Sequence, residues 1–572
     1  MSTIQNAKQQ ILLELKNAMG KEFRPSLDEI ISPPDERLGD LSFPCFSLAK
    51  SMSRSPVELA SEIAAKVEPG GYIEKAVATG PYVNFFLKRG TFARDVLFEI
   101  QKTEEEYGKA SIGEDRKIMI EYAQPNTHKE IHIGHLRNFF LGKSITLLLK
   151  EVGYKVIATS YINDLGMHVA LCVWSLQNMS EEEIKLAKTP EEKMALLGRA
   201  YADASQKTKD NPELKAEVSA IYKDLEFQKG PFVSLWKKTR KWSLSYIRSV
   251  FKELDLPIDV WYYESDLVRA TKHIIEELKK KEIVTESQGA WIVDLEKEGV
   301  GVNLLVKSDG TLLYNAKDLA LAIRKQEDYA PLRSLYIIDA RQSLAMQQLF
   351  ATLKKMGFDR DLQHIDYEFV TLKDGVMASR KGNIIRFEQL RDELFDLAKE
   401  ETSTKHADWS EKRVQTSAKA IANAALMFVM LKQDSSKKII FDPNESLSFE
   451  GHTGPYLLYT YSRMVSLLSK VPKKFAEPNL ETLTNDAEHT LIRKLSEYPQ
   501  AVISAATQYA PAKLAQYLFE LCQAFSGFYE ACPVLKEADL PRAAARVAVV
   551  GATKQVLENG FKLLGMPTIK EM

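Results

Sequence analysis

The sequence predicts a multidomain protein with a central α/β domain, a small α+β unit before it and an all-α unit after it. Its 572 residues exceed the roughly 250–300 that a single hydrophobic core usually holds. From residue 116 onward a strand, a helix and a second strand follow within about 45 residues, a βαβ unit typical of a parallel sheet. From about residue 405 nearly every segment has the apolar period of a helix.

Residues 1–108 are interpreted as the α+β unit. A helix is expected to open it, and "SPVELASEIAAKV" predicts another helix, with Ser55 as the N-cap and Pro56 in the first turn. Residues 80–90 alternate like a strand, and residues 91–108 predict a helix that ends near a glycine.

Residues 109–404 are interpreted as the α/β domain. Strands are expected in "RKIMIEYA", "KVIATSYIND" and "SLYIIDAR", with a helix that begins near residue 135 and ends at Gly153, and a helical insertion over about 175–255. Residues 289–326 predict hairpin strands followed by a helix, and residues 361–383 predict a hairpin. Residues 405–572 are then the helical unit, and no internal repeat is evident.

Composition excludes several classes of protein. The net charge is −1, from 77 basic and 78 acidic residues, so the whole chain is not an electrostatic nucleic-acid binder, although a local basic face is compatible with that charge. The four cysteines, Cys45, Cys172, Cys522 and Cys532, form no CxxC pair, so no structural zinc is expected and a reducing compartment is favoured. Without a signal peptide or a long apolar run, we expect a cytoplasmic protein that does not span a membrane.

The stretch "EYAQPNTHKEIHIGHLRNFF", residues 121–140, is the first candidate site. It leads from a strand into the first turn of a helix, where free backbone N–H groups and the helix dipole favour an anion. His132 and His135 are three apart and face the same side, and Gly134 lets a flat group approach the backbone. A metal site would need a third ligand in helical register, which His128 does not supply. From these residues alone, an ordinary strand–turn–helix connection stays open.

The string His132-Ile133-Gly134-His135 resembles the HIGH signature of class I aminoacyl-tRNA synthetases, and the wider stretch from Glu121 to Arg137 is similar to the arginyl family. Gln124, His128 and Glu130 depart from that family's usual residues. Further segments resemble the family in the same order along the chain: "LGDLSFPCFSLAK", "SYINDLGMHV", "YYES", "LLYNAKDLA", "YIIDARQ", "HTGPYLLYTYSR" and "VLENGFKLLGMPTIKEM".

This resemblance implies a Rossmann-like catalytic domain with insertions, an N-terminal domain that touches the tRNA elbow, and a C-terminal helical bundle that binds the anticodon. The implied enzyme is an arginine–tRNA ligase that forms arginyl-adenylate from L-arginine and ATP, then transfers arginine to the terminal ribose of tRNA(Arg). ATP would carry Mg²⁺, no zinc would be needed, and the chain would be a monomer.

The resemblance also implies an arginine pocket. A guanidinium is planar and always charged, so carboxylates recognise it best. On helical spacing alone, the Tyr314 and Asp318 pair could instead belong to a solvated helix face, and Glu264 could be a surface carboxylate. The residues implied to hold arginine are Glu121, Asn126, Glu264, Tyr314, Asp318 and Gln342.

The second class I signature, KMSKS, is incomplete. The corresponding segment of this sequence is "VMASRKGN", in which Val376 and Ser379 occupy the positions of the two lysines. The charge of departing pyrophosphate needs other cations, and Lys129 is implied to replace one of them. A solvated loop lysine is the alternative. His132, His135 and Lys129 would be the catalytic residues, and ATP would contact Lys129, His132, Gly134, His135, Met377, Arg380 and Lys381.

Three other functions compete with this one. A cysteinyl synthetase would need a zinc pocket, which scattered cysteines do not favour. A tRNA-binding relative without catalytic activity is supported only by "VMASR", which lacks the two lysines of the KMSKS signature. A plain dinucleotide-binding protein would carry GxGxxG after the first strand, and the sequence has none there.

Overall fold

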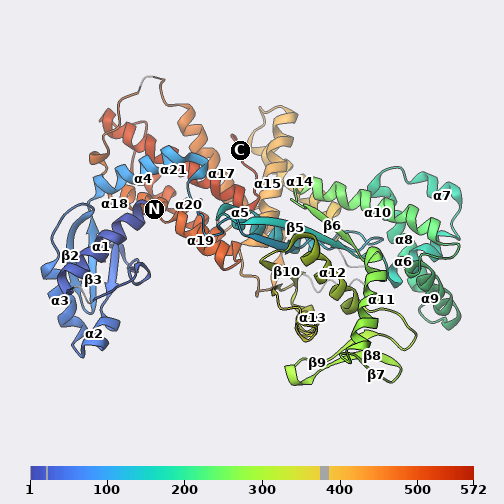
Figure 1. The fold of residues 1–572 in the computed structure, drawn as a ribbon. Coiled ribbons are helices and arrows are strands. Elements are labelled where there is room, and N and C mark those ends of the chain that lie inside the picture. The colour runs from blue at the N-terminus through green and yellow to red at the C-terminus, as the bar shows by residue number, and fades with distance from the viewer. Residues whose placement is uncertain (1, 21–22, 374–384, 474) are drawn as a thin grey trace.

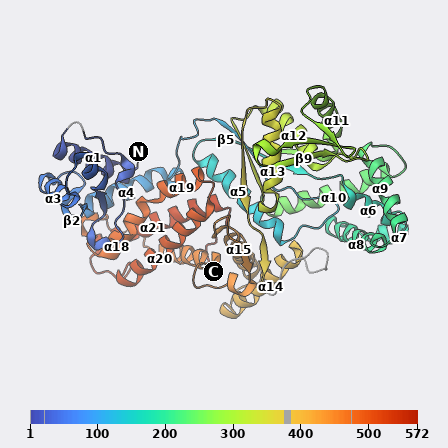
Figure 2. The same ribbon diagram turned by 90° about the horizontal axis from the view of Figure 1, so that it is seen from below.

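The structure is a computed structural model that describes residues 2–20, 23–373, 385–473 and 475–572. The molecule is elongated (Figure 1). The N-terminal unit and the helices that follow β5 (Lys155–Ile162) lie at opposite ends, with the central sheet and the C-terminal helices between them (Figure 2). The ATP contacts predicted at Met377, Arg380 and Lys381 lie outside the described residues.

The N-terminal unit packs helices on a three-stranded antiparallel sheet of order β1–β3–β2. As predicted, Ser55 is the N-cap of α3, and its hydroxyl accepts a hydrogen bond from the Glu58 backbone at 3.5 Å. The expected opening helix and the strand within residues 80–90 are also confirmed. The elements are α1 (Thr3–Met19), η1 (Leu27–Glu29), η2 (Glu36–Leu38), β1 (Leu41–Pro44), α2 (Phe46–Met52), α3 (Pro56–Lys66), β2 (Ile73–Thr79), β3 (Tyr82–Leu87), α4 (Arg89–Thr103) and η3 (Glu104–Glu106).

The central sheet has five strands in the order β11–β10–β4–β5–β6, and all four pairings are parallel. The chain enters at β4, moves outward to β5 and β6, then returns to the other side of β4 for β10 and β11. Ligands of such sheets bind where the strand order reverses, beyond the carboxyl ends of the strands. Here that point lies between β4 and β10. The strands are β4 (Lys117–Glu121), β5 (Lys155–Ile162), β6 (Val260–Tyr263), β10 (Arg333–Asp339) and β11 (Asp361–Tyr367).

Helices and a small antiparallel sheet connect these strands. The helices between β5 and β6 form one end of the molecule (Figure 2). β7, β8 and β9 form an antiparallel sheet beside α13, which confirms hairpin strands followed by a helix in residues 289–326. The remaining elements of this region are α5 (Ile133–Glu151), α6 (Met167–Leu176), α7 (Glu181–Leu186), α8 (Pro190–Thr208), α9 (Pro212–Glu226), α10 (Val233–Glu253), α11 (Glu264–Lys280), β7 (Thr285–Ser287), β8 (Ala290–Leu295), η4 (Glu296–Glu298), β9 (Gly301–Val306), α12 (Tyr314–Tyr329), η5 (Ala340–Gln342) and α13 (Ser343–Lys355).

The hairpin predicted for residues 361–383 is wrong for the part that the structure describes. β11 joins the parallel sheet beside β10, whereas β12 (Val370–Leu372) pairs in parallel with β13 (Ile439–Phe441). Only Glu368 and Phe369 separate β11 from β12, and neither residue favours the positive φ of a two-residue hairpin turn. Alternating hydrophobicity identified the strands but not their partners, because pairing is a tertiary property.

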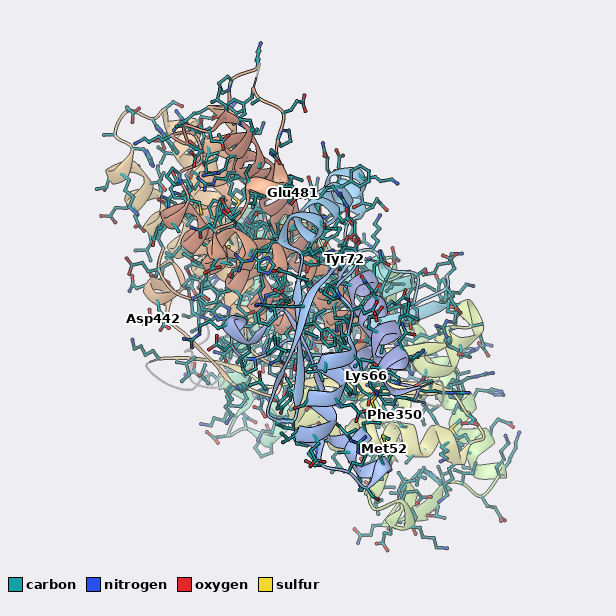
Figure 3. All side chains as sticks on the ribbon, turned by 90° about the vertical axis from the view of Figure 1, so that its left-hand side faces the viewer. Met52, Lys66, Tyr72, Phe350, Asp442 and Glu481 are labelled. Atoms are coloured by element: carbon teal, nitrogen blue, oxygen red, sulfur yellow. The ribbon has the colours of Figure 1, made fainter. Side chains whose placement is uncertain are left out.

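The C-terminal part is helical, as predicted, and packs against both other parts. α5 is buried on nearly every side because the sheet covers one face and α15, α19 and α21 cover the others. Glu481 of η7 lies beside α4 (Figure 3). The elements are α14 (Phe387–Lys405), α15 (Glu411–Leu431), α16 (Pro443–Ser446), α17 (Gly454–Ser469), η7 (Leu480–Thr482), α18 (Asp486–Ser496), α19 (Tyr498–Thr507), α20 (Pro511–Ala531) and α21 (Leu540–Leu564).

One helix of the described residues, α15, is long and apolar enough to cross a membrane by length and composition. Its most apolar window is 72% buried inside the protein. The core helix of a soluble domain passes the same test, so this helix is weak evidence for a membrane span.

Candidate active site

A cavity of about 590 Å³ opens at the carboxyl ends of β4, β5 and β10, where the strand order reverses. Nine of the residues singled out from the sequence line it: Glu121, Asn126, Lys129, His132, Gly134, His135, Tyr314, Asp318 and Gln342. Glu264 is fully buried and does not line this cavity.

The two histidines cap the helix that leaves β4. His132 is the N-cap of α5, and its Nδ1 accepts a hydrogen bond from the Gly134 backbone at 3.1 Å. His135 Nδ1 accepts one from the His132 backbone, also at 3.1 Å. The two ring centroids lie 3.9 Å apart. The predicted strand-to-helix connection is confirmed, and both rings are held at the helix N-terminus.

Both histidines are neutral in this setting. Burial lowers the pKa of His132 to about 4, with further lowering by Lys129 and Arg341. Burial also lowers the pKa of His135 well below its ordinary value. Because each Nδ1 accepts a backbone hydrogen bond, the ring proton lies on Nε2. The cavity is therefore offered two neutral N–H donors beside a helix N-terminus.

Two cations accompany these donors. Burial lowers the pKa of Lys129, whose ammonium lies 5.6 Å from the centre of the Tyr201 ring. Arg341 lines the cavity from η5, and its guanidinium donates hydrogen bonds to Asp339 at 2.7 and 2.8 Å. This end of the cavity can meet negative charge.

A second group of residues that line the cavity is acidic. Asp318 of α12 and Glu121 at the end of β4 both line the cavity. Burial and the neighbouring carboxylates of Glu121 and Glu264 together raise the pKa of Asp318 to about 8. Lys325 and Lys317 lower this pKa, but by less. A cationic ligand beside Asp318 would therefore stabilise the ionised form of its carboxyl group.

Two buried lysines of α12 neutralise the other carboxylates, and the sequence analysis did not single them out. Lys325 donates a hydrogen bond to Glu121, and Lys317 donates one to Glu264 at 2.5 Å. Lys317 also lies 3.6 Å from a carboxylate oxygen of Glu226. Lys325 follows Asp318 by seven residues and so shares its helix face, a spacing that could have identified it.

Glu264 lies behind the acidic wall. Its Oε1 accepts from Lys317, while its Oε2 has no hydrogen-bond partner among the described residues. Burial raises its pKa to about 7 in spite of Lys317. The structure brings Glu264 electrostatically close to Asp318, but its part in holding arginine stays a prediction.

Other lining residues carried no motif signal. They come from strands, helices and a loop that only the fold brings together: Asn138, Tyr161, Asn163, His168, Tyr336, Asp339 and Arg341. Asn163 and His168 belong to "SYINDLGMHV", one of the segments that resemble the family in order along the chain. That resemblance indicated that the segment lies near the active site, but it did not identify these two side chains.

The segment after residue 384 returns to the histidine element. Ile133 donates a backbone hydrogen bond to Ile385 at 3.3 Å, and Phe387 donates one to Ile131 at 2.9 Å. Arg386 contacts the carboxylate of Glu130 at 3.1 Å. Residues 385–387 and β12 therefore both lie beside the site, because β12 also packs against α5 and Val370 lines the cavity.

Three family models match the chain. The model described as "tRNA synthetases class I (R), catalytic domain" matches residues 97–443. The "DALR anticodon binding domain" matches residues 457–572, and the "Arginyl tRNA synthetase N terminal domain" matches residues 5–87. Together they span most of the sequence.

Named relatives and solved structures agree with these models. A Bdellovibrio bacteriovorus protein named arginine–tRNA ligase is 37% identical, with 98% of each chain covered. One from Treponema denticola is 33% identical, with 100% of each covered. The Thermus thermophilus arginyl-tRNA synthetase structure has the same fold, with a TM-score of 0.82 at 24% identity over 99% of this chain and 100% of its own. The chain belongs to the arginyl-tRNA synthetases, the class I family of arginine–tRNA ligases.

Proposed function

We propose that the cavity at the carboxyl ends of β4, β5 and β10 is where this arginine–tRNA ligase binds arginine and ATP together. The observation that carries the proposal is that two chemically different sets of residues line one cavity. One set supplies neutral N–H donors and cations, and the other supplies the carboxylates of Glu121, which has an internal lysine partner, and Asp318. We infer that the two sets form the two ends of the binding site. Arginyl-adenylate has the matching charges, a phosphate at one end and a guanidinium at the other.

At the first end, His132, His135 and Lys129 are the catalytic residues. The carboxylate of arginine attacks the α-phosphate of ATP, and pyrophosphate leaves. Two Nε2–H groups and the Lys129 ammonium stabilise the charge that develops on the phosphate oxygens. Gly134 leaves room for the adenine against the backbone. No protein nucleophile is required, because catalysis consists of positioning and charge stabilisation.

ATP enters with Mg²⁺ as its counter-ion. Met377, Arg380 and Lys381, which lie outside the described residues, are proposed as further ATP contacts. Ile385 and Arg386 lie beside the histidine element and support that placement, because they follow the segment directly.

At the second end, Asp318 and Glu121 receive the guanidinium, with Glu264 behind them. Asn126, Tyr314 and Gln342 supply further polar contacts around the substrate. A lysine substrate would be rejected, because its compact ammonium leaves partners of the planar guanidinium without hydrogen bonds.

The second half-reaction transfers arginine to the 2′-hydroxyl of the terminal ribose of tRNA(Arg). Residues 1–108 are proposed to touch the tRNA elbow, residues 109–404 to carry catalysis, and residues 405–572 to bind the anticodon. The domain matches at 5–87, 97–443 and 457–572 support this division. We further propose that the enzyme acts as a cytoplasmic monomer without zinc.

The test is pyrophosphate–ATP exchange measured with each amino acid, with and without tRNA. Exchange that depends on arginine is expected. Exchange that favours another amino acid would overturn the proposed pocket, and no exchange under any condition would support a tRNA-binding relative without catalysis. Comparing reactions with and without tRNA also shows whether the activation step needs tRNA.

A further inference from the structure

Glu130 lies in the loop between β4 and α5, directly after Lys129, at one of the positions where the sequence departs from the usual residues of its family. Its side chain is 27% exposed, and its Oε1 accepts a hydrogen bond from Nη1 of Arg386 at 3.1 Å. Burial raises the pKa of Glu130, whereas the Arg386 guanidinium lowers it. The proposed function uses neither side chain, although Glu130 lies two residues before His132.

Arg386 is also joined to the histidine element through the backbone. Two backbone hydrogen bonds, of 2.9 and 3.3 Å, connect residues 131–133 with residues 385–387. They form a short antiparallel bridge in which His132 and Arg386 face each other. The side chain of Arg386 then returns to Glu130. The bridge and the ion pair together therefore hold Arg386 beside the N-cap of α5.

Two helices from the connection between β5 and β6 support this arrangement. A Cβ on Gly198 of α8 would lie 3.2 Å from the carboxyl carbon of Glu130, so this glycine lets α8 approach the carboxylate closely. In α10, the Tyr246 hydroxyl accepts a hydrogen bond from the Ile131 backbone at 3.3 Å and donates one to Glu388 at 2.6 Å. Both strands of the bridge are thereby held by neighbouring helices.

A shift of this bridge would move both histidines of the site. The backbone N–H of His132 donates to the His135 ring, and the His132 ring accepts from the Gly134 backbone, so both rings follow the backbone of residue 132. A misplacement of about 1 Å can cost about 10²-fold in rate. A partly exposed ion pair contributes little to folding stability. Loss of the Glu130–Arg386 pair is therefore expected to change the geometry of the site and to leave the fold intact.

We propose that Glu130 is a positioning residue for the activation step, because it holds Arg386 opposite His132 and thereby keeps the Nε2–H donors of the two histidines directed at the α-phosphate. This inference rests on the proposed catalytic role of His132 and His135. It assigns a function to a residue at which this chain departs from its family, and Arg386 acts with that residue rather than as a contact of the substrate.

The experiment is a double-mutant cycle of Glu130→Ala and Arg386→Ala, measured by pyrophosphate–ATP exchange on the full-length protein in the presence of tRNA. Each single substitution should lower kcat by about 10- to 100-fold, while the KM values for ATP and arginine stay within about twofold. The double variant should be no slower than the slower single variant, because both substitutions remove the same interaction.

Charge reversal separates positioning from a merely structural role. Glu130→Arg places two cations together and should be slow, and adding Arg386→Glu re-forms the pair in reverse and should recover most of kcat. Glu253→Ala is the matched control, because Glu253 of α10 pairs with Arg391 of α14 at 3.3 Å and its side chain is 33% exposed. Its kcat should stay within about twofold of that of the unmodified enzyme.

An unchanged kcat in Glu130→Ala would overturn the inference. Additive losses in the cycle would do the same, because they would mean that the two side chains act separately. A raised KM for ATP at unchanged kcat would also contradict it, since that pattern indicates a direct contact with ATP. Urea unfolding checks the fold of each variant. If an alanine variant unfolds, the charge-reversed pair decides, and a double reversal as slow as Glu130→Arg alone would overturn the inference.

His132→Ala separates this inference from the proposed function. It should lower kcat by about 10²–10³-fold, as expected when one donor to the developing charge is lost. If it does so while Glu130→Ala leaves kcat unchanged, only the positioning inference fails. If His132→Ala leaves kcat unchanged, the proposed catalytic role of the histidines fails.

Discussion

Lys325 donates a hydrogen bond to the carboxylate of Glu121, a residue 204 positions earlier in the chain, and both side chains are at least 95% buried. Lys317 makes the same kind of pair with Glu264. These internal cations offset two of three neighbouring carboxylates, Glu121 in the cavity wall and Glu264 behind it. Asp318, the third, makes no ion pair within the described part of the chain. Because Asp318 alone of these three carboxylates has no internal cation among the described residues, this acidic group suits a ligand that brings one positive charge.

Replacing Lys325 by methionine should destabilise the protein. The change leaves Glu121 buried without its partner, and breaking a buried ion pair in this way typically costs about 3–5 kcal/mol. Urea unfolding of the variant measures the loss. The double variant Lys325→Met/Glu121→Gln should recover most of it, because no uncompensated charge remains. An unchanged midpoint in the single variant would mean that the pair contributes nothing to stability.

Arginine binding should strengthen as the pH rises towards 8. The pKa of Asp318 is raised to about 8, so below that pH its carboxyl group is increasingly protonated, whereas the guanidinium requires the ionised form. Each pH unit below 8 should therefore raise the Kd of arginine by up to about tenfold. Calorimetry between pH 6 and 8.5 measures this slope. A Kd that stays flat across the range in the unmodified protein would contradict the prediction.

Asp318→Asn should raise the KM for arginine with a smaller effect on the KM for ATP. The substitution removes the charge that the guanidinium needs, and hydrogen bonds to charged groups contribute about 1.5–3 kcal/mol, which corresponds to roughly 10- to 150-fold. Asp328→Asn is the matched control, because Asp328 lies on the same helix but binds Arg324 and Tyr262 instead. Equal effects of the two variants would argue that Asp318 acts only through the helix.

Lys129→Ala should reduce pyrophosphate exchange by about 10²–10³-fold, as is usual when one donor to a developing oxyanion is lost. Lys155→Ala is the control, since that lysine is 63% exposed at the opposite end of β5. Exchange at the unmodified rate in Lys129→Ala would remove this residue from the phosphate role.

Local features of this chain were predictable because their interactions are local. The histidine caps of α5 join residues two and three positions apart, and Ser55 caps α3 through Glu58 in the same way. The parallel sheet followed from strand–helix–strand order. The pairing of β11 and β12 did not follow, because their partners lie in β10 and in β13, and residues 439–441 are far along the chain.

The sequence by itself determined the family, the order of the motifs and the nine cavity residues that motif resemblance singled out. Only the tertiary structure decided that Glu264 lies behind the cavity wall and that Lys317 and Lys325 offset two carboxylates. It also showed that Asn163 Oδ1 and His168 Nε2 have no hydrogen-bond partner among the described residues. The reason is physical. A cap or a helix face is set by neighbours a few residues apart, whereas burial, charge pairing and the tautomer of a histidine depend on groups that folding alone brings into contact.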